Sequence, residues 1–400
     1  MNIALNHRMY CCCLLMLIQP AASATDFNGY LRSGVGSNDS GGDQVCFKLP
    51  AAPAKYRLGN ECETYGELSL SHKLVQNSDG SYFKLTTTLA FAVAADQDWE
   101  TYTPSWRQVY IESGSLFSSQ SWKTARFWAG KKFYRRHDAH INDFFFWDNS
   151  GPGAGVEDIS LKHSRLAYAW RRNTSSDDRA ITQHDLRWYQ LNSNPNGQLT
   201  LGLNLIQPDQ SQPGLITHQG QQLHILHQQT QLFGATNTLA LQYGIGAGAS
   251  LDNTVDDTID DSQQTVRLVE QLLFNSDQHW RTMLVYIHEH KQHIQRWQSV
   301  GIRPIYYFSE HFSLALELGH DNIRPDNGPE QQLSKITIAP QLSATRGFWA
   351  RPVLRAFISY ADWNNAAQQS AVAGDTISST GVFGSSTQGM TIGFQAEAWW

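Results

Sequence analysis

The sequence lacks any long apolar run after its first 24 residues. No later stretch approaches the roughly 20 apolar residues that a membrane-spanning helix requires. No segment has the period of a helix longer than a turn or two. The chain therefore offers two architectures, a soluble β protein or a transmembrane β-barrel, whose alternating strands escape hydropathy scales. It also shows no sequence repeat and no interdomain linker, so we expect residues 25–400 to form one domain.

Positive charge is also scarce. The 400 residues include 30 lysines and arginines against 36 acidic residues, and no basic run interrupts them. Nucleic-acid binding requires a basic patch or stripe, so the composition gives no reason to expect a nucleic-acid partner. Aromatic residues, in contrast, make up 12% of the chain, and glycine occurs 30 times. Both frequencies fit a β protein of either kind.

Residues 1–24 have the pattern of a signal peptide. Arg8 stands in a short leading region, Met9–Ile18 forms an apolar core, and Ala22–Ala24 supplies an A-x-A cleavage site. Cys11–Cys13 fall inside that core and suggest a lipid-anchored protein as an alternative. No small-residue lipobox precedes them, which argues against the anchor.

Cysteine is rare in the remaining chain, where only Cys46 and Cys62 occur. Two cysteines in an exported protein are most simply a disulfide. Such a bond would close a loop of about 15 residues and stabilise the fold by about 3 kcal/mol through chain entropy.

The dominant period after residue 24 is two. Apolar and polar residues alternate through 83–93, 199–205 and 312–318, which predicts half-apolar strands of about ten residues. Segments rich in glycine, asparagine, aspartate, proline or glutamine separate the strands, namely 192–197, 207–222, 252–264 and 366–388.

The C-terminal segment favours a membrane barrel over a soluble sandwich. Along residues 390–400, methionine, isoleucine, phenylalanine, alanine and Trp400 share one face of the expected strand. Threonine, glycine, glutamine, glutamate and Trp399 share the other face, so alternation directs Trp399 inward. A soluble sandwich would gain nothing from an aromatic pair at its last strand end, whereas a lipid-facing strand would.

One stretch, Ala125–Asp158, is too polar for a core strand and too aromatic for an idle surface loop. It begins as a plausible strand, continues through arginine, aspartate and histidine, and then runs into Phe144–Trp147. Guanidinium groups, carboxylates and flat rings suit a sugar, whose hydroxyls form hydrogen bonds while its C–H faces stack. Asp138 and Asp143 could alternatively be the acid/base pair of a glycosidase.

Two other patterns are weaker candidates for a ligand site. His288 and His290 share one face of a possible strand, with His293 beyond, and the three could ligate zinc. Neither an HExxH motif nor a cysteine partner accompanies them, so we expect solvent-exposed loop histidines. Gly151–Gly155 lacks the lysine and the following helix of a phosphate-binding loop, so we expect a turn there.

The segment 128–155, WAGKKFYRRHDAHINDFFFWDNSGPGAG, resembles the signature loop of the maltoporin family. The resemblance implies a transmembrane antiparallel β-barrel of about 18 strands in the Gram-negative outer membrane, with this loop folded inward as a constriction. It also implies a homotrimer in outer-membrane lipid that conducts maltodextrin-like oligosaccharides and ions without cofactor, metal or catalysis. In the family a cysteine pair staples the first outer loop around the segment KYRLGNECETY, which here is 55–65 with Cys46 and Cys62 as the pair.

The resemblance also implies residue roles. In maltoporins a helical ladder of aromatic rings guides the sugar, and one ring of the ladder reaches in from a neighbouring subunit. The residue at that position here is Trp99. The implied ladder comprises Tyr30, Tyr65, Trp99, Trp349 and Trp399. The implied polar track and constriction comprise Arg32, Arg57, Glu67, Arg107, Arg136, Asp138, His140, Asp143 and Phe145.

Two positions depart from the family pattern. Phe145 stands where the family usually has tyrosine, so a hydroxyl that can donate to and accept from sugar is missing. Ala235-Thr236 stands in the loop where a further aromatic rung is expected. Both departures concern which sugar is preferred. An exported carbohydrate-active enzyme and a general diffusion porin without sugar selectivity remain the alternatives.

Overall fold

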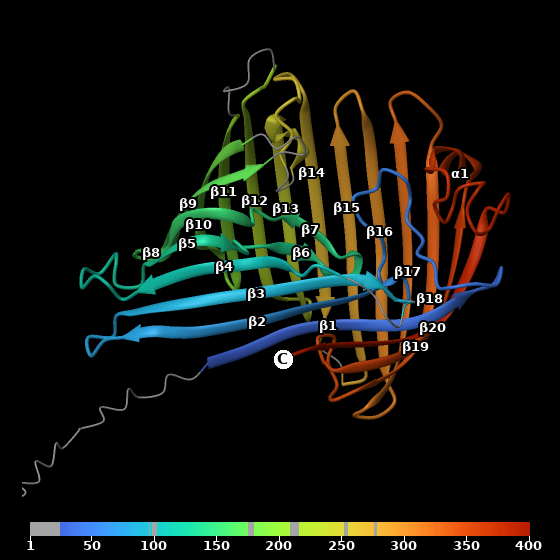
Figure 1. Cartoon of the computed structure of the whole chain (residues 1–400), viewed down its shortest axis with the longest axis horizontal. Helices are drawn as coiled ribbons and strands as arrows, with labels where there is room; N and C mark the ends of the chain where they lie inside the picture. Colours follow the sequence, from blue (N-terminus) through green and yellow to red (C-terminus); the bar gives the residue numbers. More distant parts are fainter. Residues whose placement is uncertain are drawn as a thin grey trace, which may run out of the picture.

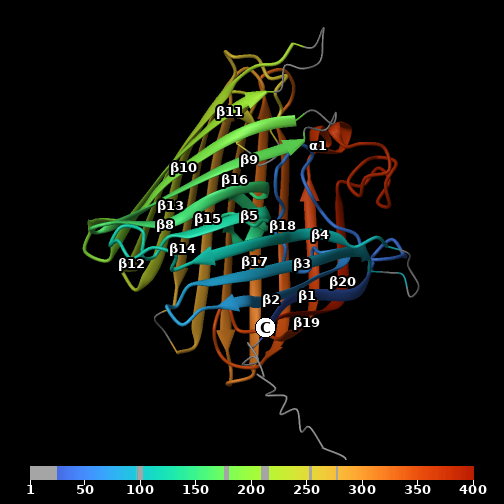
Figure 2. The ribbon, with the colours of Figure 1, turned by 60° about the vertical axis from the view of Figure 1, so that its left-hand side comes forward.

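The computed structural model describes residues 25–95, 97, 102–174, 180–208, 216–251, 255–275 and 278–400. The expected signal peptide at 1–24 and the expected rung Trp99 lie outside these residues. Within them, antiparallel strands form one 18-stranded sheet that closes on itself, because β1 pairs with β2 on one side and with β20 on the other (Figures 1 and 2). The expected barrel of about 18 strands is therefore confirmed.

The strands of the barrel are β1 (Thr25–Asn38), β2 (Glu63–Gln76), β3 (Tyr82–Ala94), β4 (Ser105–Gly114), β5 (Arg126–Lys132), β8 (Gly151–Leu161), β9 (Ser164–Thr174), β10 (Ala180–Asn194), β11 (Gly197–Pro208), β12 (Gly220–Leu232), β13 (Ala235–Gly246), β14 (Gln264–Phe274), β15 (Trp280–Lys291), β16 (Gln295–Tyr307), β17 (Phe312–Pro325), β18 (Gln331–Ser343), β19 (Val353–Trp363) and β20 (Gln388–Trp399).

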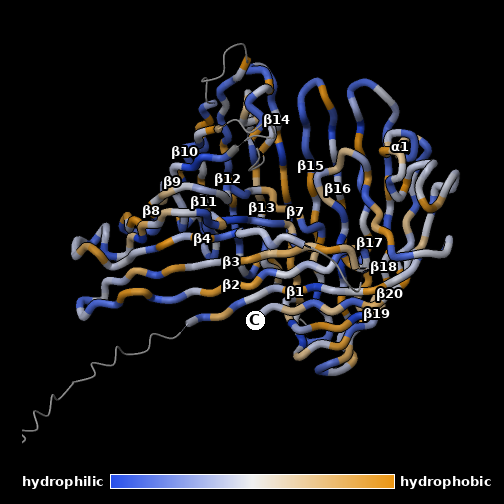
Figure 3. Tube along the Cα trace, viewed as in Figure 1, coloured by the Kyte–Doolittle hydropathy of each residue, from blue (hydrophilic) through white to orange (hydrophobic). Residues whose placement is uncertain are grey.

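Side chains alternate between two faces of this wall, as the period of two predicts. Along β20, Gln395 and Glu397 are buried while Ile392 and Phe394 are exposed. Hydrophobic and hydrophilic segments accordingly alternate along the strands instead of gathering in one block (Figure 3). The wall thus has an exposed apolar face and a buried polar face, the inverse of a soluble protein.

Buried charges on the polar face neutralise one another. Glu317 on β17 accepts from Arg303 on β16 at 2.7 Å, and its other oxygen lies 3.0 Å from Lys335 on β18. Buried ions are costly unless they are paired, so cross-strand pairs of this kind allow charged side chains to occupy the polar face.

The connections differ between the two ends of the barrel. At one end they shrink to two residues, at 162–163, 195–196 and 233–234. At the other end they include 247–263, which holds η2 (Ala247–Ser250), and 364–387, which holds α1 (Asn365–Ser370). The described residues contain no helix long and apolar enough to cross a membrane.

The turn expected at Gly151–Gly155 is wrong, because these residues begin β8 and pair with β5. A Cβ on Gly153 would lie 2.4 Å from the carbonyl oxygen of Trp170, and a Cβ on Gly155 would lie 2.5 Å from that of Tyr168. The glycines therefore permit close strand packing rather than a turn.

The interpretation of the histidines as loop residues is also wrong for two of them. His288 and His290 lie on β15, half-buried, and alternate with the buried Ile287 and Glu289. Only His293 follows the strand in an exposed turn. Among the described residues no group of three or more potential ligands could hold a metal ion. Ala235-Thr236, expected in a loop, forms the start of β13.

Candidate functional site

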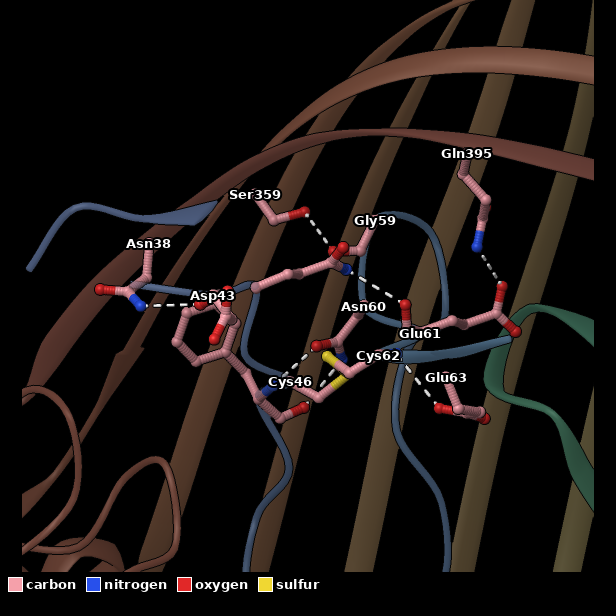
Figure 4. Close-up of a disulfide and its surroundings, with 12 residues drawn as sticks. Asn38, Asp43, Cys46, Gly59, Asn60, Glu61, Cys62, Glu63, Ser359 and Gln395 are labelled. Atoms are coloured by element: carbon pink, nitrogen blue, oxygen red, sulfur yellow. Dashed lines mark hydrogen bonds between the residues drawn. A yellow bond between two sulfur atoms is a disulfide. The ribbon is translucent and has the colours of Figure 1, made fainter. Parts of the chain in front are cut away.

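A disulfide-closed loop between β1 and β2 packs against the polar face. Cys46 and Cys62 form the expected disulfide, with their Cα atoms 5.9 Å apart (Figure 4). Asn60 lies between the two arms of the loop, where its side chain accepts from the backbone N–H of Phe47 at 2.6 Å and donates to that residue's carbonyl at 2.8 Å. The loop is therefore held by backbone contacts as well as by the covalent bond.

The tip of this loop is anchored on β16 to β19. Lys335 donates to the carbonyl oxygen of Leu58 at 2.8 Å, and the backbone N–H of Leu58 donates to Glu317 at 3.0 Å. The ring of Tyr56 lies over Gly301 and Gly319, which are cross-strand partners, and a Cβ on either glycine would come within 2.0 Å of it. The two glycines thus form a seat for the ring.

A second loop, residues 133–150, connects β5 to β8 and contains β6 (His137–Ala139), η1 (His140–Asn142) and β7 (Phe144–Trp147). Trp147 stacks on His224 of β12 at 4.5 Å, where Gly202 leaves space for the indole. Gln242 of β13 donates to the carbonyl oxygen of Phe146 at 2.7 Å. The aromatic run therefore packs against the polar face of β11 to β13.

The two loops meet at η1. The backbone N–H of Arg57 donates to the carbonyl oxygen of Ile141 at 3.0 Å. The backbone N–H of His140 donates to Gln271 of β14 at 3.2 Å, and Asp143 adopts a left-handed conformation with φ 53°. The disulfide-closed loop, the 133–150 loop and β14 therefore meet at η1.

Aromatic rings form a continuous row beside this cluster. Tyr65 and Tyr30 lie 5.9 Å apart between ring centroids, and Tyr30 stacks on Trp399 at 6.4 Å. His140 contacts Trp399 at 6.4 Å and Trp349 at 4.6 Å. Four of the five expected rungs are therefore adjacent, and all four keep exposed surface.

Charged side chains run alongside this row. Arg32 pairs with Glu61 at 2.9 Å and lies 3.5 Å from Asp143. Arg57 pairs with Glu61 at 2.7 Å and with Glu397 at 3.3 Å. The expected polar residues Arg32, Arg57, His140 and Asp143 thus come together with the aromatic rungs.

A second group of expected residues surrounds Phe145. The guanidinium of Arg136 lies 3.6 Å from the ring centroid of Phe133 and 4.7 Å from that of Phe145. The guanidinium of Arg107 lies 5.4 Å from the ring centroid of Phe133. Tyr65 interacts electrostatically with both Arg107 and Arg136, which connects this group to the aromatic row, and it donates its hydroxyl to Glu67.

Asp138 and Asp143, the candidate acid/base pair, have different partners. Asp143 lies near Arg32, whereas Asp138 lies 4.0 Å from Nδ1 of His140. Burial, followed by the negative charge of Asp143, raises the pKa of Asp138. Burial lowers the pKa of His140 well below its ordinary value, so His140 is neutral near pH 7 and adds no charge to the group.

Several site residues were missed from the sequence. Arg351 lies 4.2 Å over the ring of Trp399, and both Arg351 and Arg355 pair with Glu397 at 2.7 Å. Alternation along 390–400 placed Glu397 on the same face as Trp399, and that signal could have identified it. Nothing in the local sequence indicated that the 344–352 connection turns Arg351 toward the same ring.

Comparisons with known proteins identify relatives. A family model described as LamB porin matches residues 25–400. The outer membrane channel DcaP of Acinetobacter baumannii matches with a TM-score of 0.56 at 10% identity, over 95% of this chain and 98% of that chain. OccAB1 of the same organism matches with a TM-score of 0.54 at 10% identity, over 94% of this chain and 96% of that chain.

The outer membrane protein OpdK from Pseudomonas aeruginosa matches with a TM-score of 0.51 at 11% identity, over 94% of this chain and 99% of that chain. OpdK has also been solved with vanillate. At such low identity these likenesses establish the fold alone.

Proposed function

Because the chain belongs to the LamB porin family and forms an outer-membrane β-barrel channel, we propose that it conducts oligosaccharides by facilitated diffusion along the aromatic row. Membership of a porin family indicates a channel rather than the exported glycosidase that Asp138 and Asp143 suggested. The preferred solutes of the proposal are maltose and maltodextrin-like sugars, together with ions.

One observation carries the proposal, the row formed by Tyr65, Tyr30, Trp399 and Trp349 with charged groups beside it. A pyranose stacks its C–H face on a ring and directs its hydroxyls sideways to charged donors and acceptors. Several adjacent weak sites let a solute enter and leave, as conduction requires. A general diffusion porin needs no such row.

The two loops narrow the pathway in this proposal. The loop at 133–150 contributes Phe145 and Asp143, and the disulfide-closed loop contributes Arg57. Their mutual contact between Arg57 and Ile141 supports a constriction built from both loops together. The aromatic row then leads the sugar to this narrow point.

Liposome swelling tests the proposal. Purified protein in liposomes should admit maltose and maltotriose faster than non-sugar solutes of equal mass, because ring stacking favours the sugars. Swelling rates that depend on solute mass alone would favour the general porin. Preferential uptake of vanillate over every sugar would point to another solute class.

A further inference from the structure

Two guanidinium groups beside the aromatic row form no ion pair with any residue that the structure describes. Arg107 on β4 and Arg136 in the 133–150 loop are both half-buried. Within the part of the chain that the structure describes, neither donates a hydrogen bond or forms an ion pair. Both instead lie over the ring of Phe133.

The other arginines nearby are neutralised. Arg135, next in sequence to Arg136, pairs with Glu157 at 3.0 Å. Arg32 and Arg57 both pair with Glu61. Arg107 and Arg136, in contrast, are two positive charges on the same ring whose N–H groups donate to no described residue.

The fold holds both groups in place. The register between β3 and β4 shifts between Thr88 and Leu89, which leaves Arg107 as the extra residue of a β-bulge. Bulges re-aim side chains. The next residue, Gln108, accepts from the backbone N–H of Phe133 at 3.0 Å and so fixes the ring on which both arginines lie.

Aromatic stacking fixes a guanidinium plane but leaves its N–H edge available. Arg136 lies between the rings of Phe133 and Phe145, at 3.6 Å and 4.7 Å. Five N–H donors in a rigid fork match a carboxylate or phosphate in two-pronged contact. Asp138 interacts electrostatically with Arg136, but its side-chain contact is with Nδ1 of His140, 4.0 Å away.

We propose that Arg107 and Arg136 bind the oxyanion, carboxylate or phosphate, of an acidic sugar as the sugar passes Tyr65. This inference rests on the proposed sugar channel and specifies one class of solute within it. The sugar ring contacts the aromatic row while its anionic substituent meets the two guanidinium groups. A neutral sugar has no anionic substituent to make this contact.

Ion-current block in a planar bilayer at pH 7 tests this inference. Glucuronate and glucose 6-phosphate should half-block the current at concentrations about tenfold lower than glucose, as expected for hydrogen bonds to charged groups. Inorganic phosphate alone should block no better than glucose. Arg107→Gln and Arg136→Gln should each reduce the acidic-sugar advantage, measured as the ratio of the half-blocking concentrations of glucose and of the acidic sugar, from about tenfold to nearly one.

Arg324→Gln is the matched control, since Arg324 at the end of β17 pairs with Glu330 and its side chain is 62% exposed. It removes the same charge but should leave the acidic-sugar advantage intact. In a salt gradient the zero-current potential should shift toward cation preference in both site variants and not in the control.

Equal block by glucose and glucuronate in the parent would overturn the inference, as would an advantage that survives both site variants. Block by inorganic phosphate as strong as by glucose 6-phosphate would also overturn it, because the sugar would then contribute nothing. The proposed sugar channel would stand in each case if neutral sugars still blocked. If no sugar blocked, the zero-current potential would still decide whether the two arginines act on anions.

Discussion

Two neighbouring tryptophans illustrate how a single residue position sets a role. Trp399 stacks with Tyr30 beside the charged cluster, whereas Trp400 lies on Phe27 at 5.6 Å with 47% of its surface exposed. The residues are chemically identical, but Trp399 ends β20 and Trp400 follows it, so their side chains lie on opposite sides of the wall. Alternation from the sequence predicted this difference correctly.

Replacing Trp399 should weaken binding of every sugar that the channel accepts. Loss of one stacked ring removes about 0.5–1.5 kcal/mol of binding free energy, in addition to the contribution of the buried area. This corresponds to a loss of about two- to tenfold in affinity. Current-block titrations with maltotriose on Trp399→Ala would measure the effect. The control is Trp170→Ala, which removes a tryptophan of β9 that is 41% exposed, and this variant should bind maltotriose as the parent does. Equal binding by Trp399→Ala and the parent would remove the row from the pathway.

A hydroxyl added at Phe145, in the proposed constriction, should tighten maltooligosaccharide binding modestly. Phe145 is 37% exposed, so the added hydroxyl of Phe145→Tyr would be accessible to sugar. A neutral hydrogen bond contributes about 0.5–1.5 kcal/mol, so the half-blocking concentration should fall by up to about tenfold. A variant that binds more weakly would show that the hydroxyl disturbs the contact between Arg136 and the ring.

At the scale of elements, the sequence predicted strands better than it predicted what packs on them. The period of two located β3, β11, β17 and β20, because one face of each strand is apolar. Gly301 and Gly319 gave no sign of their function, since a seat for Tyr56 depends on two strands becoming neighbours. Residues 151–155 were misread because glycine marks close packing as well as turns.

The attachment of the 133–150 loop should weaken at acid pH. Burial, followed by the charges of Arg187 and Arg135, lowers the pKa of His137 to about 3. In a detached loop the histidine would return to about 6.5, so the detached state binds more protons between these two values. The contribution of His137 to the free energy of attachment is therefore fully present above pH 6.5 and is lost progressively below it, by about 3 kcal/mol at pH 4.5.

Current recordings at pH 7.5 and pH 4.5 would measure this effect. Fluctuations of the open channel should increase at the lower pH in the parent and increase less in His137→Gln, which cannot take up the proton. Fluctuations that are independent of pH in both proteins would contradict the assignment of His137 as a buried neutral group.

For the molecule as a whole, the family resemblance supplied what strand patterns could not. Periodicity alone left a soluble β protein and a membrane barrel open, and the closed ring of 18 strands with its buried polar face agrees with the barrel. The aromatic row joins residues from β1, β2, β20 and the 344–352 connection. A local sequence pattern could not have predicted that these residues are neighbours, because their adjacency depends on the strand register of the closed sheet.

The channel should be a homotrimer. Exposed apolar side chains cover the outer wall, and a subunit interface can bury part of that surface. Protein kept unheated in SDS should migrate well above its 45.0 kDa chain and shift to the monomer position after boiling. Protein that remains monomeric in mild detergent would contradict this prediction.

The most direct test of the sugar channel is the concentration dependence of current block by maltotriose through the parent protein in a planar bilayer. A sugar that occupies discrete sites along the row must reduce the ion current in a saturable manner. We expect a hyperbolic titration curve with complete reversal on washout. A current that no oligosaccharide reduces, or that falls only in proportion to solution viscosity, would contradict it.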